Sequence, residues 1–303
     1  MSGKEFVAIG KATISEFGKD DVAYMSAALT YYSFFSLFPL LILAITVAGS
    51  FMDPREATVF ILTNTARVMP GLDDSIQKML REIFESRANA GILALVGLGT
   101  LAFSASGAFD ALDKAINRAW NSEKVPSFLI GKLTSFAMMA VAALMLILSF
   151  VVTASLATTR ALTEMAIGKL YGEQIFWQIV NFGASVGLVF LVFLLMYRFL
   201  PRCEAKFRDV WVGALLAAIA WSLVKEGFAY YLGSSFANFQ AVYGALGTVI
   251  ALMTWIYISS VIILAGAEFA SETARFRRLQ LTAAGEKAQE SERRRTSPWL
   301  PNT

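Results

Sequence analysis

Histidine is absent from this chain, and cysteine occurs once, at Cys203, in 303 residues. The absence of histidine removes the most common general base and the usual protein ligand of transition metals. A single cysteine permits neither an internal disulfide nor a cluster of thiolate ligands. These absences argue against a metalloenzyme, and we expect no cofactor and no enzymatic activity.

Charge is also scarce. Charged residues make up 16% of the chain, whereas soluble domains average about 25%. Hydrophobic residues make up 56%, and they gather in six stretches long enough to cross a hydrocarbon core of about 30 Å as helices. We therefore predict an all-α, polytopic membrane protein with six transmembrane helices. The predicted spans are Ala27–Phe51, Ala90–Phe109, Leu133–Ala157, Ile175–Tyr197, Val210–Leu232 and Tyr243–Ala270.

Lysine and arginine are concentrated in the segments on the N-terminal side of the membrane, and far fewer lie on the opposite side. The positive-inside rule then places both termini in the cytoplasm, as an even number of spans requires.

Three segments lie outside the predicted transmembrane domain of residues 26–270. Residues 1–25 are predicted to form a cytoplasmic amphipathic helix at the membrane interface. Residues 53–89 are broken by Pro70 and predict an external helical hairpin. Residues 271–303 are polar and basic and are expected to be disordered. The arginines of this tail suit either anionic lipid headgroups or a stop-transfer anchor.

The most unusual polar residues are Lys225 and Glu226, which interrupt the fifth span. A buried charge there costs at least about 2.5 kcal/mol, so we expect a partner or a water-filled cavity. Adjacent helical residues point about 100° apart and need not pair with each other. An interhelical ion pair that fixes packing and a role in transport are both consistent with these residues.

The second span continues into a helix with one polar face, made by Asp110, Asp113, Lys114, Asn117 and Arg118. Their spacing of three and four residues is typical of a solvated helix end with internal ion pairs, which is the favoured interpretation. The functional alternative is an inner gate or a rim that binds lipid headgroups.

Two further features concern contacts between helices. Glu268 lies near the inner end of the sixth span, with no basic residue close by in sequence until Arg275, and is expected to find its partner on another helix. Gly183 and Gly187 form a GxxxG spacing in the fourth span, for which packing inside the bundle is favoured over a homo-oligomer contact.

Several of these segments together resemble the YihY/virulence-factor-BrkB family, over about residues 20–275 in the expected order. The matching segments are Ala27–Leu40, Ser104–Leu112, Asn117–Trp120, Arg208–Ala218, Tyr243–Leu252 and Gly266–Glu268. The resemblance implies a bacterial inner-membrane protein of six helices. The family once carried the label ribonuclease BN, which this sequence argues against, since it has no histidine, no two-metal carboxylate cluster and no folded basic surface. We expect no nucleic acid partner.

Three functions remain open. A transporter, flippase or exporter of an amphiphilic or anionic envelope component is the first hypothesis, with membrane lipids as partners. No Walker A motif is present, so such transport would need a gradient, a partner or downhill flow. The alternative is a scaffold for envelope assembly that transports nothing. An intramembrane enzyme is the weakest hypothesis, because no acid–base or nucleophile constellation is recognisable.

Overall fold

The computed structural model describes residues 3–49, 53–68, 91–122, 126–167, 173–233 and 246–296. Every regular element in these ranges is a helix, as predicted for an all-α membrane protein. The helices are α1 (Gly3–Lys19), α2 (Val22–Ala48), α3 (Pro54–Val68), α5 (Gly91–Ala119), α6 (Phe128–Ile167), α7 (Glu173–Phe199), α8 (Phe207–Gly233) and α10 (Gly247–Thr296).

Two helix ends are set by left-handed residues. Asp21 has φ of 51° and follows α1, and Asn121 has φ of 48° and follows α5. Asp and Asn are the non-glycine residues that adopt this conformation most readily, so each of them ends its helix sharply. As a result α1 ends at Lys19, before the boundary predicted at residue 25, and α2 begins at Val22.

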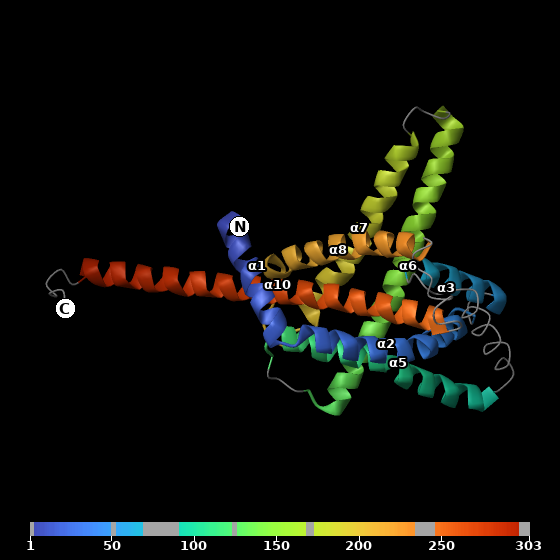
Figure 1. Ribbon diagram of the computed structural model, residues 1–303, viewed down its shortest axis with the longest axis horizontal. Helices are drawn as coiled ribbons and strands as arrows, with labels where there is room; N and C mark the ends of the chain where they lie inside the picture. The colour runs from blue at the N-terminus through green and yellow to red at the C-terminus, as the bar shows by residue number, and fades with distance from the viewer. Residues whose placement is uncertain are drawn as a thin grey trace.

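The bundle consists of α2, α5, α8 and α10, which lie side by side with similar axes (Figure 1). Its larger core lies near the end where α5 and α7 finish and α8 begins, around Ile116, Tyr197, Val210 and Leu264. A smaller core joins α2, α3 and α10 at the opposite end, around Ile45.

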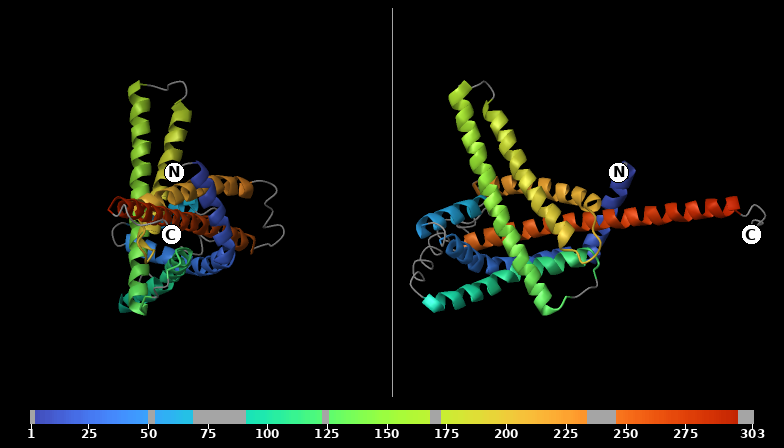
Figure 2. Two further views of the ribbon diagram at one scale, coloured as in Figure 1. Left: turned by 90° about the vertical axis from the view of Figure 1, so that its left-hand side faces the viewer. Right: turned by 180° about the vertical axis from the view of Figure 1, so that it is seen from behind.

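The hairpin of α6 and α7 leaves this bundle. Its far ends project well away from the other helices, as the two further views show (Figure 2). The most apolar stretch of α6 has no buried residue within the chain. An apolar stretch whose side chains the chain leaves uncovered is suited to a lipid environment rather than to water.

Five described helices are long and apolar enough to cross a membrane: α2, α6, α7, α8 and α10. The second predicted span, Ala90–Phe109, falls almost entirely on α5, which is helical but is not among these five. The count of six spans therefore stays a prediction. The first part of the predicted external hairpin is α3, and its second part lies outside the described residues.

The prediction of a disordered tail is wrong as far as Thr296. Helix α10 runs without a break from the last span into the tail over 50 residues. The first turn beyond the predicted span is itself packed, because Glu272, Thr273 and Ala274 are buried. A polar composition indicated disorder, but the helix is already nucleated by the apolar span, and extending a helix is far easier than starting one.

Helices α8 and α10 cross at two glycines. A Cβ atom on Gly266 would lie 2.5 Å from the hydroxyl oxygen of Tyr197, and one on Gly213 would lie 2.6 Å from the carbonyl oxygen of Gly266. Tyr197 donates a hydrogen bond of 2.6 Å to the carbonyl of Ile263, which ties α7 to the same crossing. The backbones approach closely because no side chain separates them.

Candidate functional site

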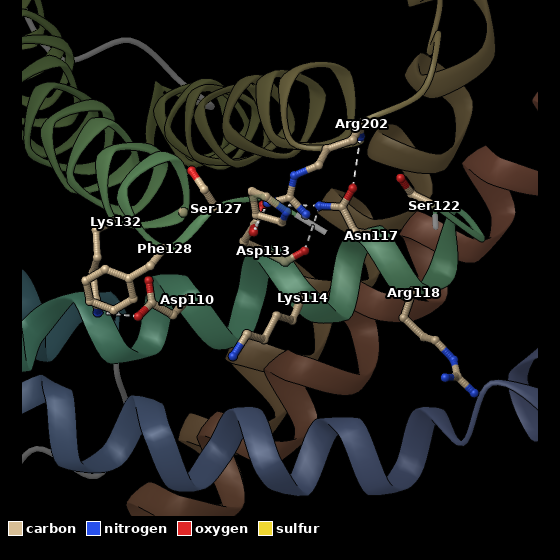
Figure 3. A pocket seen from close by; sticks show the side chains of 12 residues that line it. Asp110, Asp113, Lys114, Asn117, Arg118, Ser122, Ser127, Phe128, Lys132 and Arg202 are labelled. Carbon is tan, nitrogen blue, oxygen red and sulfur yellow. Dashed lines mark hydrogen bonds and ion pairs between the residues drawn. The ribbon is translucent and has the colours of Figure 1, made fainter. Parts of the chain in front are cut away.

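A pocket of about 390 Å³ opens at the end of the bundle where α5 finishes and α6 begins (Figure 3). The five residues of the polar face predicted on the second span all line it. The lining residues are Asp110, Asp113, Lys114, Asn117, Arg118, Ser122, Pro126, Ser127, Phe128, Gly131, Lys132 and Arg202. The predicted helix face thus becomes one wall of the pocket, and α6 and the segment after α7 supply the rest.

Asp113 and Asn117 join α5 to the segment that follows α7. Asp113 is 7% exposed in its side chain and forms an ion pair with Arg202. Asn117 donates from Nδ2 to Oδ1 of Asp113 at 3.1 Å and to the carbonyl of Leu200 at 3.1 Å, and its Oδ1 accepts from the backbone N–H of Arg202 at 2.9 Å. Both side chains are satisfied within the protein, so their first role is to hold this wall in place.

Burial raises the pKa of Asp113 above its ordinary value of 3.8, and the hydrogen bond and positive charge of Arg202 oppose this rise without cancelling it. Desolvation disfavours the ionised form of a carboxyl group, while a nearby cation favours it. A nearby Asp110 charge contributes further to the rise. This carboxyl group therefore holds its proton more tightly than an exposed aspartate does.

A second network joins α5 to α6. Lys132 forms an ion pair with Asp110, donates a 2.7 Å hydrogen bond to Oγ of Ser106, and lies 4.4 Å from the centre of the Phe103 ring. Ser135 donates to the other oxygen of Asp110. The Lys132 side chain is only 15% exposed, so its charge is matched almost entirely by protein groups.

Lys114 and Arg118 are the two cations of the pocket that face outward. Both are exposed, and they extend from α5 away from the Asp113–Arg202 pair (Figure 3). Arg118 Nε lies 3.4 Å from Oδ1 of Asp20, whereas Lys114 forms no ion pair with any residue that the structure describes. With Lys132 and Arg202, the lining holds four cations against two carboxylates, an excess of positive charge.

The pocket borders an apolar surface. Phe128 lines it and is 71% exposed, and the next residues of α6, Leu129, Ile130 and Leu133, are exposed as well. A molecule held there would meet cations and hydroxyl groups on one side and a bare apolar helix on the other. This combination suits an amphiphile with an anionic headgroup better than a fully polar solute.

The other candidate residues lie elsewhere. Lys225 and Glu226 sit in α8 and line neither described pocket. They pair with each other, with Nζ 3.2 Å from Oε1 and side-chain exposures of 19% and 64%. Glu268 is 1% exposed in α10, and its neighbour on another element is the carboxyl group of Asp20 rather than a base.

Sequence reasoning did not identify Lys132, Arg202 or Asp20 as part of any site. In the sequence, Lys132 and Arg202 contributed only to the predicted orientation in the membrane. A basic residue next to an apolar run has the same sequence pattern whether its side chain is free or in an ion pair. Asp20 stands in a turn that the sequence did not predict. No described group of three or more histidine, cysteine, aspartate or glutamate residues is arranged to hold a metal ion.

Comparison with known proteins places the chain in a large set of relatives. The model of a family described as Virulence factor BrkB matches residues 13–293. A putative ribonuclease-like protein, YfkH, from Bacillus subtilis (strain 168) is 29% identical over 80% of this chain and 86% of its own length. A UPF0761 membrane protein from Xanthomonas oryzae pv. oryzae (strain PXO99A) is 32% identical over 89% of this chain.

This chain spans 62% of the length of that Xanthomonas protein, and 59% of a UPF0761 membrane protein from Xanthomonas campestris pv. campestris (strain B100), to which it is 32% identical. No solved structure matches the chain significantly.

Proposed function

Because the chain belongs to the virulence factor BrkB family of integral membrane proteins, we propose that it moves an anionic amphiphile across the bacterial inner membrane. The pocket at the basic end would receive the headgroup, and the bare apolar start of α6 would hold the acyl chain. In this proposal the basic end and both termini face the cytoplasm.

The observation that carries the proposal is the excess of cations in a pocket that borders exposed apolar residues. The pocket volume of about 390 Å³ lies within the usual range for small-ligand sites of about 300–1,000 Å³. Lys114 would be the first contact of a phosphate or carboxylate, since it is exposed and has no described ion-pair partner. Arg118 would add positive charge beside Lys114 while keeping its contact with Asp20.

Two residues in α8 fit the same proposal. Lys225 and Glu226 place a charged pair within the apolar part of α8, and intramembrane charges often mark a transport path. The pair would offer a second polar position for a headgroup that has left the basic end. The sequence has no Walker A motif, so the driving force would be a gradient, a partner or the lipid's own concentration difference.

A scaffold that transports nothing is the second candidate, and a specific observation favours it. Asp113, Asn117 and Arg202 satisfy one another, as do Asp110 and Lys132. Such closed networks fix helix positions without any ligand. The ribonuclease-like name belongs to the Bacillus relative, and we propose no activity on RNA for this chain.

The test is lipid movement in liposomes that contain the purified protein and fluorescent phosphatidylglycerol. We expect wild type to expose the inner-leaflet probe to a membrane-impermeant quencher, and Lys114→Gln to slow this by roughly tenfold, because it loses one charge-assisted contact. The matched control is Lys206→Gln, which removes an exposed cation from the same end of the bundle but not from the pocket.

Equal slowing by both variants would mean that surface charge alone matters, and would contradict a specific site. No protein-dependent movement of the probe, with both variants folded as wild type, would instead favour the scaffold. Faster movement of phosphatidylcholine than of phosphatidylglycerol would contradict recognition of an anionic headgroup.

A further inference from the structure

A second group of ionisable residues lies outside the pocket, where the turn between α1 and α2 packs against α10. Asp20 in this turn is 7% exposed, and Glu268 in α10 is 1% exposed. Their carboxyl groups are neighbours across this contact and influence each other electrostatically. Removing an ionised group from water costs several kcal/mol, so two carboxylates buried side by side need compensation.

The protein supplies only part of that compensation. Oδ1 of Asp20 is 3.4 Å from Nε of Arg118. Oδ2 of Asp20 and Oε1 of Glu268 are both buried, and neither has a hydrogen-bond partner among the described residues. Ionised carboxylates only accept hydrogen bonds, so two of them cannot satisfy each other. The missing component is a hydrogen-bond donor.

The surrounding charges do not provide one. The nearest ionisable groups on the two packed helices are also acidic: Glu16 on α1 and Glu272 on α10. Arg275 lies 4.0 Å from Glu16 and 3.3 Å from Glu272, and Lys19 lies 2.7 Å from Glu16. Lys19 and Arg275 are therefore paired with Glu16 and Glu272. Among the described residues, Arg118 of α5 is the one cation paired with either Asp20 or Glu268.

We propose that Asp20 and Glu268 share one bound proton, so that the turn between α1 and α2 forms a proton-binding site with α10. The proton is the donor that these two buried oxygens lack. The protonated pair carries one negative charge, which Arg118 balances. Two carboxyl groups held close together are rarely both ionised, and such pairs commonly share a single proton.

Loss of the proton would act on the docking of α1. The pair would then hold two negative charges at the C-terminal end of α1. Their mutual repulsion would weaken the packing of α1 against α10. Several contacts between α1 and α10 would oppose this separation, and the Glu16–Arg275 ion pair at 4.0 Å is one of them. The rings of Phe6 and Phe269 lie 5.5 Å apart, and Gln280 donates to Glu5 at 3.1 Å. The bound proton thus makes the attachment of α1 dependent on pH, whether or not the protein transports anything.

Infrared spectroscopy of the full-length protein tests the proton directly. Protein labelled with ¹³C on aspartate and glutamate, in a detergent without ester groups, should show the C=O band of a protonated carboxyl group at neutral pH. We expect Glu268→Gln and Asp20→Asn each to abolish that band. Glu272→Gln is the control, since it changes a buried glutamate of the next turn that is already paired with Arg275.

Absence of the band in wild type, or its survival in Glu268→Gln and in Asp20→Asn, would overturn the proposal. Thermal unfolding gives a second measurement. One proton bound only in the folded state lowers the folding equilibrium constant by up to tenfold for each pH unit as the pH rises through its release. Glu268→Gln, whose amide is a permanent donor, should lack this loss, and parallel pH profiles would contradict the shared proton.

Discussion

At the scale of single residues, Asp113 offers a measurable link between burial and pH. Its folded pKa is raised above 3.8 by desolvation, despite the ion pair with Arg202. A raised pKa means that the folded protein binds a proton more tightly than the unfolded chain does. The stability that Asp113 contributes is therefore complete below its ordinary pKa and is lost as the pH rises through its folded pKa.

We expect Asp113→Asn to remove this dependence. The free energy of unfolding of wild type, relative to the variant, should fall by up to about 1.4 kcal/mol for each pH unit within that window. Thermal unfolding in detergent micelles from acidic to neutral pH measures the difference. A relative stability that rises with pH would show that the attraction of Arg202 outweighs desolvation.

The sequence predicted the polar face of α5 but not its partners. Spacing within one helix places Asp110, Asp113 and Asn117 on one side, because helical geometry is local. It does not show that Asp113 binds Arg202, which is 89 residues away, since that contact depends on how α7 turns into α8. Lys225 and Glu226 were predicted to need partners, but their pairing with each other depends on rotamers that no sequence pattern encodes.

At the scale of helices, the glycines show which contacts are tight. The GxxxG motif of α7 predicted packing inside the bundle, but a Cβ on Gly183 or Gly187 would meet no atom within 4 Å. The close crossing is made by Gly213 and Gly266 instead. Both pairs look alike in sequence, because small residues mark only where an approach is allowed.

We expect Gly266→Ala to lower stability by about 1–3 kcal/mol, because the added methyl would overlap Tyr197 and Ala217, which are fixed in the core. Gly187→Ala makes the same chemical change in open space, and should be neutral or stabilise by up to about 1 kcal/mol through helix propensity. Melting temperatures of the two variants in one detergent provide the comparison. A greater loss for Gly187→Ala would indicate that α7 packs against a second copy.

At the scale of the whole molecule, the basic segments collect at one end. Arg118, Arg202 and Arg277 come from three separate parts of the chain, and all three form ion pairs there, with Asp20, Asp113 and Asp209. Charge patterning in the sequence predicted that these segments share one side of the membrane. The helix order and most spans followed from hydropathy, whereas the outward lean of α6 and α7 did not, because hydropathy carries no information about tilt.

The proposed orientation is tested by single cysteines in a Cys203→Ser background. Leu281→Cys lies on an exposed part of α10 and Val59→Cys on an exposed part of α3. A membrane-impermeant maleimide should label the second variant in intact spheroplasts and the first only after permeabilisation. The opposite pattern would invert the protein in the membrane.

The continuity of α10 has a mechanical consequence. Fifty residues without a break make a rod of about 75 Å at 1.5 Å per residue, and its inner half is fixed in the bundle by the crossing at Gly266. Its outer half projects beyond the other helices (Figure 1). A rod of this kind is a lever arm, so any force or torque on the tail acts on the α8–α10 crossing without being absorbed by a loose joint.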